Sequence, residues 1–416
     1  MAPKAPLRRS IGETLREAIE GSRVVFLSGA RQSGKTTLAR QIAAEGDADY
    51  QTLDDRAARE LALDDPAEFV ARDRLLIIDE VQRGGDDLLL AIKAQVDVDN
   101  RPGQFLLTGS TRFLTVPTLS ESLAGRVDLI DLWPFSQGEL DQHREGFIDR
   151  IFASTSALRK RRPPHISRDA VFERVCRGGF PEAVLRKDRQ RDRWFDGYMR
   201  TLTGRDVSEI ANIQRVGDLP ALVRLLASRT ACELNVSRLA KDADLPRTTL
   251  TGYLPLLESV YLMFRLPAWS RNITSKRVKQ AKLHFLDSGL AAHLVGASPA
   301  SLARPNARMA GALLESFVAS EIARQRTWAA TDVELHHFRD RAGAEVDLVL
   351  EARDGRVAAI EVKAGRSVGR NDMRSLELLR DRIGDDFTNG VVLGCFDVVQ
   401  PLGDRLTAIP ISALWS

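Results

Sequence analysis

The sequence predicts an α/β protein of more than one domain, and we expect its N-terminal part to be a doubly wound parallel sheet. Three observations predict this class. Apolar runs at residues 24–27, 75–78 and 105–107 alternate with segments of helical periodicity. A glycine-rich loop follows the first run directly. The length of 416 residues exceeds what a single hydrophobic core supports. In such a sheet, ligands bind at the carboxyl ends of the strands.

The elements of this first part can be predicted in order. Helices are expected over residues 11–20, 36–43 and 88–96, and strands over 23–27, 50–53, 75–80 and 104–108. Strands therefore alternate with helices, which is the pattern of parallel βαβ units.

The loop at residues 29–36 reads Gly-Ala-Arg-Gln-Ser-Gly-Lys-Thr, a complete G-x-x-x-x-G-K-[ST] phosphate-binding loop (P-loop). Its glycines let successive backbone N–H groups face a phosphate chain. We expect Lys35 to reach the β- and γ-phosphates and the Thr36 hydroxyl to ligate Mg²⁺. The predicted nucleotide contacts are Gly29, Ala30, Arg31, Gln32, Ser33, Gly34, Lys35, Thr36 and Thr37.

Polar residues at the ends of later strands predict hydrolysis of the bound nucleotide. Asp79 is expected to hold the Mg²⁺ shell, and Glu80 to polarise the attacking water. Ser110 is expected to position that water, or else to cap its strand. Arg126 is expected to act as an arginine finger towards a neighbouring subunit, or else to pair with a local carboxylate. No acceptor site is recognisable, which favours a hydrolase over a kinase.

A resemblance to a known family rests on the stretches 29–38, 75–82, 106–110, 123–126, 132–136 with Glu139, 178–182, 198–207 and 285–290. Together they resemble the bacterial and archaeal family of AAA-type ATPases with an uncharacterised C-terminal region. The resemblance implies ATP as the nucleotide and an AAA-type fold, and it implies no cellular role. AAA-type ATPases usually place an arginine across a subunit boundary, so Arg126 also indicates a homo-oligomer.

Composition excludes several classes of protein. No run approaches the length of about 18 apolar residues that a membrane span needs, and the N-terminus lacks the apolar core of a secretory signal. Cys176, Cys232 and Cys395 show neither metal-site nor disulfide spacing. We therefore expect no membrane association, and buried thiols in a reducing cytoplasm.

Charge is distributed unevenly along the chain. Residues 141–310 carry 30 Lys and Arg against 17 Asp and Glu, a net charge of +13. Residues 1–140 carry a net charge of −6 and residues 311–416 one of −4. The basic middle favours a polyanionic partner such as DNA, and the alternative is a solvated basic surface.

Within this basic middle, a helix is expected at 235–241, a turn at 242–246, a second helix from 247 and a strand at 260–266. This order predicts a winged helix-turn-helix, used either for DNA binding or as a packing module. Pro255 is expected to kink the second helix, which favours phosphate contacts over reading of base sequence. The predicted DNA contacts are Arg247, Thr248, Thr249, Arg271, Lys276 and Arg277, and Lys279 and Lys282 follow in the same basic segment.

The C-terminal part carries a helix with Glu315, a strand with Asp347, and a strand with Glu361 and Lys363. This arrangement resembles the restriction-endonuclease-like nuclease core. Asp347 and Glu361 would hold Mg²⁺, with support from Glu315, and Lys363 would act on water or on the phosphorane charge. The alternative is a degenerate domain whose carboxylates form salt bridges. His336 and His337 are candidate accessory residues of this site, although a histidine pair at the end of a strand is usually structural, and zinc is not expected.

The predicted domains are an ATPase domain (1–140), a helical connector (141–229), a winged helix-turn-helix (230–310) and a restriction-endonuclease-like domain (311–416). The predicted function is that of a cytoplasmic, Mg²⁺-dependent ATPase that binds DNA and carries a candidate nuclease domain. The alternative is an ATP-gated switch or scaffold with an inactive nuclease fold that acts on a protein partner.

Overall fold

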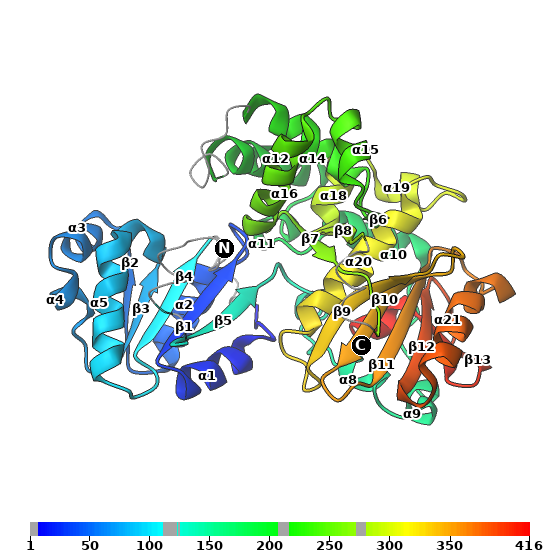
Figure 1. Ribbon diagram of the computed structural model, residues 1–416, viewed down its shortest axis with the longest axis horizontal. Helices are drawn as coiled ribbons and strands as arrows, with labels where there is room; N and C mark the ends of the chain where they lie inside the picture. Colours follow the sequence, from blue (N-terminus) through cyan, green and yellow to red (C-terminus); the bar gives the residue numbers. More distant parts are fainter. Residues whose placement is uncertain (1–6, 111–122, 124, 207–215, 272–279) are drawn as a thin grey trace. The chain divides into compact units, whose positions relative to one another are not determined.

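The structure is a computed structural model that describes residues 7–110, 123, 125–206, 216–271 and 280–416. The chain forms two compact units. One contains Met1–Phe135 together with Ser259–Tyr261, and the other contains Ser136–Glu258 and Leu262–Ser416. Both contain a sheet covered by helices, so the predicted α/β class is confirmed (Figure 1). Within the described ranges, no helix has both the length and the apolar character that a bilayer crossing requires.

The first unit is built on a five-stranded sheet of order β2-β3-β4-β1-β5, in which all neighbouring strands are parallel. Its strands are β1 (Val24–Gly29), β2 (Ala48–Thr52), β3 (Leu75–Asp79), β4 (Phe105–Gly109) and β5 (Val127–Leu132). Its helices are α1 (Gly12–Gly21), α2 (Lys35–Glu45), α3 (Arg56–Asp64), α4 (Pro66–Val70), the 3₁₀ turn η1 (Val81–Gly84) and α5 (Gly85–Val98). Sequence patterns predicted all of these strands except β5.

Helices cover both faces of this sheet. On one face, α5 packs Leu88 and Ile92 against alternate strand residues such as Phe26 and Ile78. The buried side chains of α2, including Leu38, lie outside that cluster and pack on the opposite face. Strand β1 is buried along its whole length between β4 and β5. The loop that follows β1 therefore begins at the carboxyl edge of a rigid, central strand.

The second unit opens with helices. These are α7 (Gln137–Leu140), α8 (Phe147–Ile151), α9 (Thr155–Arg159), α10 (Arg168–Arg177), α11 (Pro181–Val184), α12 (Asp188–Thr201), the π-helical η3 (Leu202–Asp206), the 3₁₀ turn η4 (Val216–Asp218) and α14 (Leu219–Ala227). A helix–turn–helix follows, formed by α15 (Val236–Asp242) and α16 (Arg247–Ser259), with Pro255 inside α16. Both helices were predicted from the sequence.

A small antiparallel sheet accompanies the helix–turn–helix. Its order is β6 (Cys232–Glu233), β8 (Lys282–Phe285) and β7 (Met263–Leu266). The helices α18 (Ser288–Leu294) and α19 (Pro299–Leu302) follow in the chain. Strand β8 lies in the centre of this sheet and all four of its residues are buried.

The C-terminal sheet has the order β13-β14-β12-β11-β10-β9. Helix α20 (Ala310–Gln325) precedes an antiparallel meander of β9 (Val333–Arg339), β10 (Glu345–Ala352) and β11 (Val357–Lys363). Helix α21 (Arg370–Ile383) and the turn η5 (Gly384–Asp386) then lead to β12 (Phe387–Gly394), which lies parallel to β11. The chain ends with β13 (Gln400–Gly403), β14 (Leu406–Pro410) and η6 (Ile411–Leu414). Residues of α21 such as Leu376 and Leu379 form a core with one face of this sheet.

Two stretches that carry the family resemblance meet inside the second unit. Asp287 is fully buried at the N-cap of α18, where it accepts hydrogen bonds from the N–H groups of Leu290 (2.9 Å) and Gly179 (2.7 Å). Gly178 has φ 68°, and a Cβ there would lie 2.3 Å from a carboxylate oxygen of Asp287. Only glycine fits this position. These stretches therefore serve to join α10 to α18.

Candidate functional site

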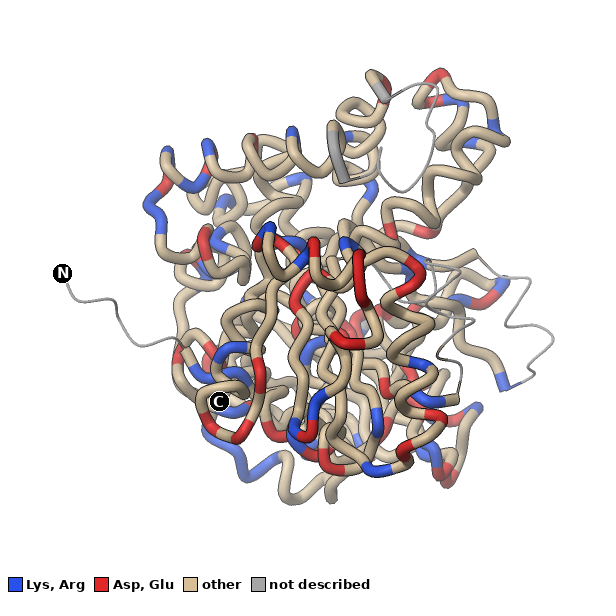
Figure 2. Tube along the Cα trace, turned by 90° about the vertical axis from the view of Figure 1, so that its left-hand side faces the viewer, with Lys and Arg blue, Asp and Glu red and all other residues tan. Residues whose placement is uncertain are grey.

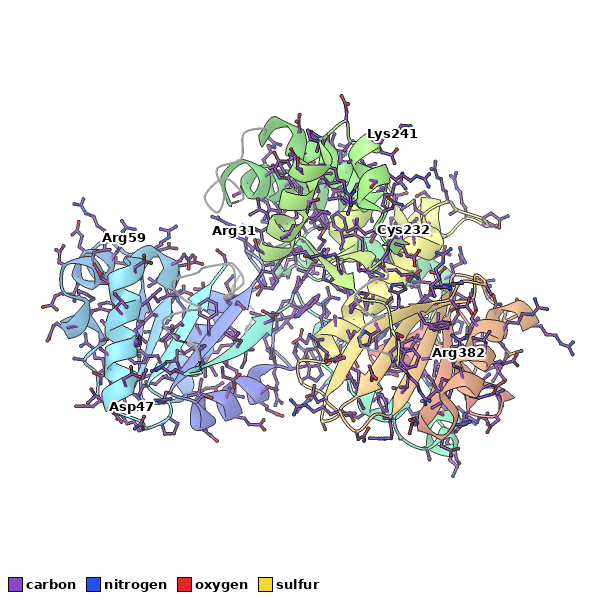
Figure 3. The ribbon with its side chains drawn as sticks, viewed as in Figure 1. Arg31, Asp47, Arg59, Cys232, Lys241 and Arg382 are labelled. Carbon is purple, nitrogen blue, oxygen red and sulfur yellow. The ribbon has the colours of Figure 1, made fainter. Side chains whose placement is uncertain are left out.

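The P-loop is shaped by two glycines with different roles. Gly34 is the N-cap of α2 and has φ 103°, a conformation that favours glycine. A Cβ on Gly29 would lie 2.3 Å from the carbonyl oxygen of Leu132, so no larger residue fits against β5. The Lys35 ammonium donates to the carbonyl oxygens of Gly29 (2.9 Å) and Ala30 (3.1 Å). The loop thus curls around the lysine, and the Arg31 side chain extends away from it (Figure 3).

A residue that sequence reasoning missed fixes the outer side of this loop. The buried guanidinium of Arg9 donates to the carbonyl oxygens of Ser33 (2.9 Å) and Trp133 (2.5 Å). It also lies over the Phe135 ring, 4.4 Å from the ring centroid. Arg9 therefore connects the loop to the end of β5.

The residues predicted to hold Mg²⁺ lie side by side. The Thr36 hydroxyl donates to Oδ2 of Asp79 at 2.9 Å. Ligands at right angles around Mg²⁺, each about 2.0–2.1 Å from the ion, are separated by roughly 3 Å. Both donors are hard oxygens, so this pair fits a Mg²⁺ shell. Tyr50 was not predicted, and its hydroxyl also donates to Asp79 Oδ2, at 2.9 Å. Burial raises the pKa of Tyr50, which keeps it a proton donor.

Glu80 is held in an unusual conformation beside this pair. It has φ 59° and ψ 47°, the left-handed region, which costs a non-glycine residue of order 1–3 kcal/mol. Its N–H donates to Thr108 Oγ1 at 3.1 Å, and the Thr108 hydroxyl donates to Asp79 Oδ1 at 2.5 Å. The Gln82 amide donates to the Glu80 carboxylate at 2.5 Å. Thr108, which was not predicted, therefore connects Asp79 and Glu80.

Ser110 and Arg126 are the two remaining predicted catalytic residues of the first unit. Ser110 follows β4 and is half-buried, but the β4 side chain that contacts Asp79 is Thr108. Arg126 donates from Nε to Asp97 at 2.5 Å, and this hydrogen bond lowers the pKa of Asp97. Arg126 thus forms a local ion pair, which was the alternative to a role as an arginine finger.

The predicted DNA contacts on the helix–turn–helix lie at the surface. Arg247 and Thr248 are exposed at the start of α16, and Thr249 is half-buried. Lys241 of α15 is also exposed, and its side chain extends into solvent (Figure 3). Arg271 donates to the carbonyl oxygen of Ile383 at 2.6 Å and lies 3.2 Å from Asp386. The predicted contacts Lys276 and Arg277, together with Lys279, lie outside the described residues.

Part of the basic charge of the middle region is used inside the second unit. Arg161 donates to the carbonyl oxygen of Ser416 at 2.8 Å, and Arg159 to that of Leu406 at 3.1 Å. Arg168 donates to the carbonyl oxygen of Ala303 at 3.1 Å. Figure 2 shows Lys and Arg interspersed with Asp and Glu along the trace. The net charge of +13 therefore overstates the positive surface available to a polyanion.

Lys282, the last lysine of the basic segment, is buried and does not lie at a surface that could contact DNA. It is 1% exposed in β8, and its ammonium lies 2.6 Å from Glu345, 2.8 Å from Glu315 and 3.1 Å from Asp347. Burial alone would lower the pKa of Lys282. The electrostatic attraction of the ammonium to three carboxyl groups outweighs burial, so the pKa is raised; these groups belong to Asp347, Glu315 and Glu345. A protonated lysine thus lies among the predicted nuclease carboxylates.

Glu361 and Lys363 complete this cluster. Register places Asp347 opposite Glu361, since Leu348 pairs with Ile360. The Lys363 ammonium lies 2.9 Å from Glu361 Oε1 and 3.3 Å from Asp372. Burial raises the pKa of Glu361 to about 8, and the nearby Asp347 charge adds to the shift.

These residues do not fit Mg²⁺ as they are arranged. One oxygen of Asp347 accepts from Lys282, and the other accepts from the N–H of Val362 at 2.9 Å. Burial also raises the pKa of Glu315 well above its usual range. A group in its acid form is a poor metal ligand, and two ammonium groups already supply positive charge here. The cluster therefore matches the salt-bridged alternative better than a magnesium centre.

The cysteines and histidines differ partly from expectation. Cys176 and Cys395 are buried as predicted, and burial raises the pKa of the Cys176 thiol to about 12. Cys232 is exposed, so the prediction was wrong for this residue, because β6 is a short strand at the edge of its sheet. His337 is buried with Nε2 3.0 Å from the carbonyl oxygen of Gln280, a structural role.

Three family matches cover different parts of the chain. Residues 21–141 match the AAA domain. Residues 168–301 match a domain of unknown function (DUF8612), and residues 310–414 match another (DUF4143).

Curated relatives of the chain are uncharacterised. Rv2008c of Mycobacterium tuberculosis and Mb2031c of Mycobacterium bovis are each 28% identical over 358 residues, covering 86% of this chain and 74% of theirs. A protein of Haemophilus influenzae is 22% identical over 308 residues, covering 67% of this chain and 71% of its own.

Solved structures give weaker likenesses. The Walker-type ATPase PABY2304 of Pyrococcus abyssi is 15% identical with a TM-score of 0.42, over 69% of this chain and 95% of its own. A RuvB variant of Thermotoga maritima is 21% identical with a TM-score of 0.28, over 62% of this chain and 89% of its own. The AAA domain match, together with the P-loop geometry, supports an ATPase of the P-loop type. The restriction-endonuclease-like assignment stays a prediction.

Proposed function

We propose that the chain is a Mg²⁺-dependent ATPase whose reaction takes place at the carboxyl edge of the first sheet. The observation that carries this proposal is the contact of Thr36 with Asp79 beside the complete P-loop. Thr36 and Asp79 would hold Mg²⁺, which would neutralise charge on the β- and γ-phosphates. Lys35 would move from the loop carbonyls to those phosphates, and the backbone N–H groups of residues 30–37 would bind phosphate oxygens.

Glu80 is the proposed base for the attacking water. It directly follows Asp79 in the chain, and its backbone conformation is fixed by Thr108. A carboxylate held in this way can accept a proton from water as the water attacks the γ-phosphate. Gln82 donates to the same carboxylate and would orient it.

Hydrolysis of ATP by the purified full chain tests this proposal. Lys35→Ala should abolish turnover. Glu80→Gln should lower turnover by at least about 100-fold while ATP still binds, because general base catalysis contributes about 10²–10⁴-fold. The matched controls are Lys93→Ala and Glu60→Gln, which change the same residue types elsewhere in the first unit. Normal turnover in Lys35→Ala would refute the assignment of the site.

We further propose that the middle region binds DNA through phosphate contacts. The support is a helix–turn–helix next to a three-stranded antiparallel sheet, the composition of a winged helix. Arg238, Lys241 and Arg247 are exposed on α15 and α16. Phosphate contacts suit these residues better than base contacts, because Pro255 interrupts the hydrogen bonding of α16.

Binding of duplex DNA at several salt concentrations tests this second proposal. Removal of one phosphate-binding side chain should reduce the slope of log affinity against log salt by about 0.9. Arg238→Ala and Lys241→Ala should each show this reduction, whereas the control Lys187→Ala before α12 should not. Unchanged affinity in the double variant would remove this surface from consideration. Stimulation of ATP hydrolysis by DNA would connect the two activities.

For the C-terminal domain, the geometry favours the alternative function, an ATP-gated switch or scaffold without nuclease activity. The observation is the Lys282 ammonium among Glu315, Glu345 and Asp347. We expect supercoiled plasmid to stay intact with Mg²⁺ or Mn²⁺ present. Nicking that disappears in Asp347→Ala would overturn this view and restore the nuclease. A cytoplasmic location, a protein partner and an oligomer joined through Arg126 remain parts of the proposal that need separate tests.

A further inference from the structure

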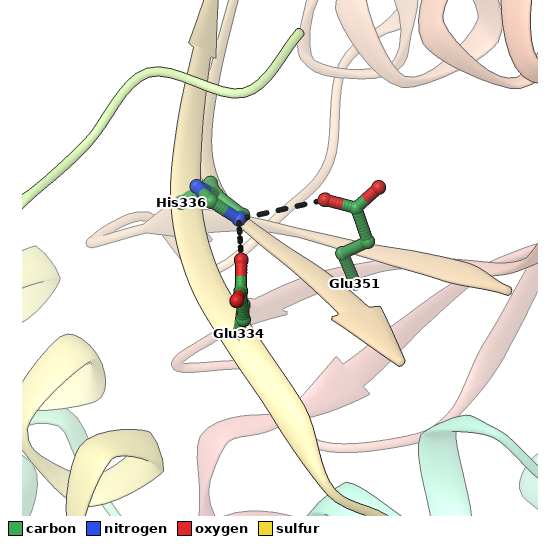
Figure 4. A group of neighbouring side chains, drawn as sticks. All are labelled: Glu334, His336 and Glu351. Atoms are coloured by element: carbon green, nitrogen blue, oxygen red, sulfur yellow. Dashed lines mark ion pairs between the residues drawn. The ribbon is translucent and has the colours of Figure 1, made fainter. Parts of the chain in front are cut away.

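A group of three side chains on the C-terminal sheet lies apart from the sites above. Strands β9 and β10 are antiparallel, and their register places Glu334 directly opposite Glu351. His336 lies two residues beyond Glu334 and therefore on the same face of β9. Its Nε2 is 3.4 Å from an oxygen of Glu334 and 3.6 Å from an oxygen of Glu351 (Figure 4). All three ligand atoms lie within 4.8 Å of one another.

Two glutamates placed directly across a strand pair repel each other, and such like-charged pairs destabilise a sheet. The repulsion is removed when positive charge lies between the two carboxylates. Both carboxylates face the same nitrogen of His336. This arrangement differs from that of His293, which contacts Asp192 through Nδ1 and Asp196 through Nε2. The ligand atoms of Glu334, His336 and Glu351 therefore converge on one point, whereas those around His293 do not.

The spacing and chemistry of the three atoms fit a transition metal. Ligands at about 2.0–2.2 Å from a tetrahedral Zn²⁺ are separated by roughly 3.3–3.5 Å. One imidazole and two carboxylates form a mixed donor set that suits Zn²⁺, Co²⁺ or Fe²⁺ better than Mg²⁺. His336 is 5% exposed and Glu334 76% exposed, so the nitrogen is fixed while one carboxylate can close over an ion from solvent.

We infer that Glu334, His336 and Glu351 form a binding site for a divalent ion of the Zn²⁺ class, with three protein ligands and a position left for water. This site would bind its metal independently of ATP, because all three residues belong to the second unit, whereas Thr36 and Asp79 belong to the first. A histidine pair at the end of a strand is usually structural, and local sequence does not connect His336 with Glu351, which lies 15 positions away and approaches it only through strand pairing.

Titration with Co²⁺ tests the inference on the full chain, in the presence of excess Mg²⁺ to occupy the P-loop. Tetrahedral Co²⁺ absorbs visible light strongly, and binding to a thiolate such as Cys232 would show a separate sulfur charge-transfer band. We expect one Co²⁺ site, displaced by one equivalent of Zn²⁺. Loss of a residue that only supports a metal ligand weakens metal binding about 10–100-fold, so loss of the ligand in His336→Gln should weaken it at least about 100-fold.

The variant Glu351→Gln provides a second test that leaves the histidine in place, and it should weaken Co²⁺ binding as well. The matched control is His293→Gln, which removes a histidine flanked by two aspartates that do not converge. Unfolding midpoints of all variants without metal would show that each is folded. Undiminished Co²⁺ binding in His336→Gln, or no saturable site in the wild type, would overturn the inference and leave the group as a histidine that bridges two glutamates.

Discussion

Replacement of Lys282 by methionine tests the central feature of the C-terminal domain. Methionine keeps the apolar stem of the lysine and removes only the charge. The ammonium lies 2.8 Å from Glu315 and 3.1 Å from Asp347, and all three side chains are at least 87% buried. At an effective dielectric constant of 20, the contact of the ammonium with the Asp347 carboxylate corresponds to roughly 5 kcal/mol of Coulomb energy before desolvation is subtracted, and Glu315 adds to this sum only in its ionised form. Glu345 is 35% exposed, so solvent screening excludes it from this sum.

Removal of one partner from a buried ion pair typically costs about 3–5 kcal/mol, and we expect a loss of stability of this size for Lys282→Met. Added Mg²⁺ should stabilise Lys282→Met more than it stabilises the wild type, since the position of the lost ammonium is surrounded by carboxylate oxygens.

Urea unfolding followed by tryptophan fluorescence measures this change. Four of the five tryptophans lie in the second unit, so the signal reports mainly on the unit that contains Lys282. Lys187→Met, at an exposed position, is the matched control. Glu315→Gln keeps the ammonium and should cost less than Lys282→Met, because burial already favours the acid form of Glu315. A loss below about 1 kcal/mol for Lys282→Met would refute the reasoning, because surface ion pairs contribute no more than that.

Three more outcomes can be checked. Thr108→Val removes the hydroxyl that donates to Asp79, and we expect ATP hydrolysis to fall about 10–100-fold with folding intact, as for other supporting residues of metal sites. Gly29→Ala would place a Cβ 2.3 Å from the Leu132 carbonyl oxygen, so ATP binding measured by calorimetry should be lost, whereas Gly21→Ala, with open space around it, should bind normally. Burial raises the pKa of Glu145 to about 8, above its ordinary value of 4.5. The folded wild type therefore holds a proton that the unfolded chain releases, and its stability falls as the pH rises from about 5 to 8. Glu145→Gln should abolish that fall, which is at most about 5 kcal/mol, and identical pH profiles in urea unfolding would contradict it.

The nucleotide site was predictable where its residues are contiguous in the chain. The P-loop and the Asp79-Glu80 pair follow buried strands, so local pattern alone indicated their place at the edge of a sheet. Thr108 could not be assigned in this way, because it reaches Asp79 only through the pairing of β3 with β4. The same holds for Arg9, which lies 124 residues from the carbonyl group of Trp133 that it binds.

In the C-terminal part, sequence reasoning identified Glu315, Asp347 and Glu361 as neighbours but misjudged the charge around them. Lys282 lies in a basic segment, and its burial depends on β8 being the central strand of its sheet. Nothing in the local sequence distinguishes it from the other basic residues of that segment. Once it is buried among carboxylates, the expected chemistry of the cluster changes from metal binding to ion pairing.

The segment Ser259–Tyr261 determines whether the first unit can be expressed as a stable fragment. It belongs to the first unit, although the chain on either side of it belongs to the second. The Tyr261 side chain is buried, and its hydroxyl donates to Asp131 at 2.5 Å and lies 2.8 Å from the Ser28 hydroxyl. A fragment that ends at residue 135 would lack this tyrosine and leave a cavity beside β1. An expressed ATPase fragment should therefore be less stable than the same residues in the intact chain, and its weak activity would be no evidence against the site.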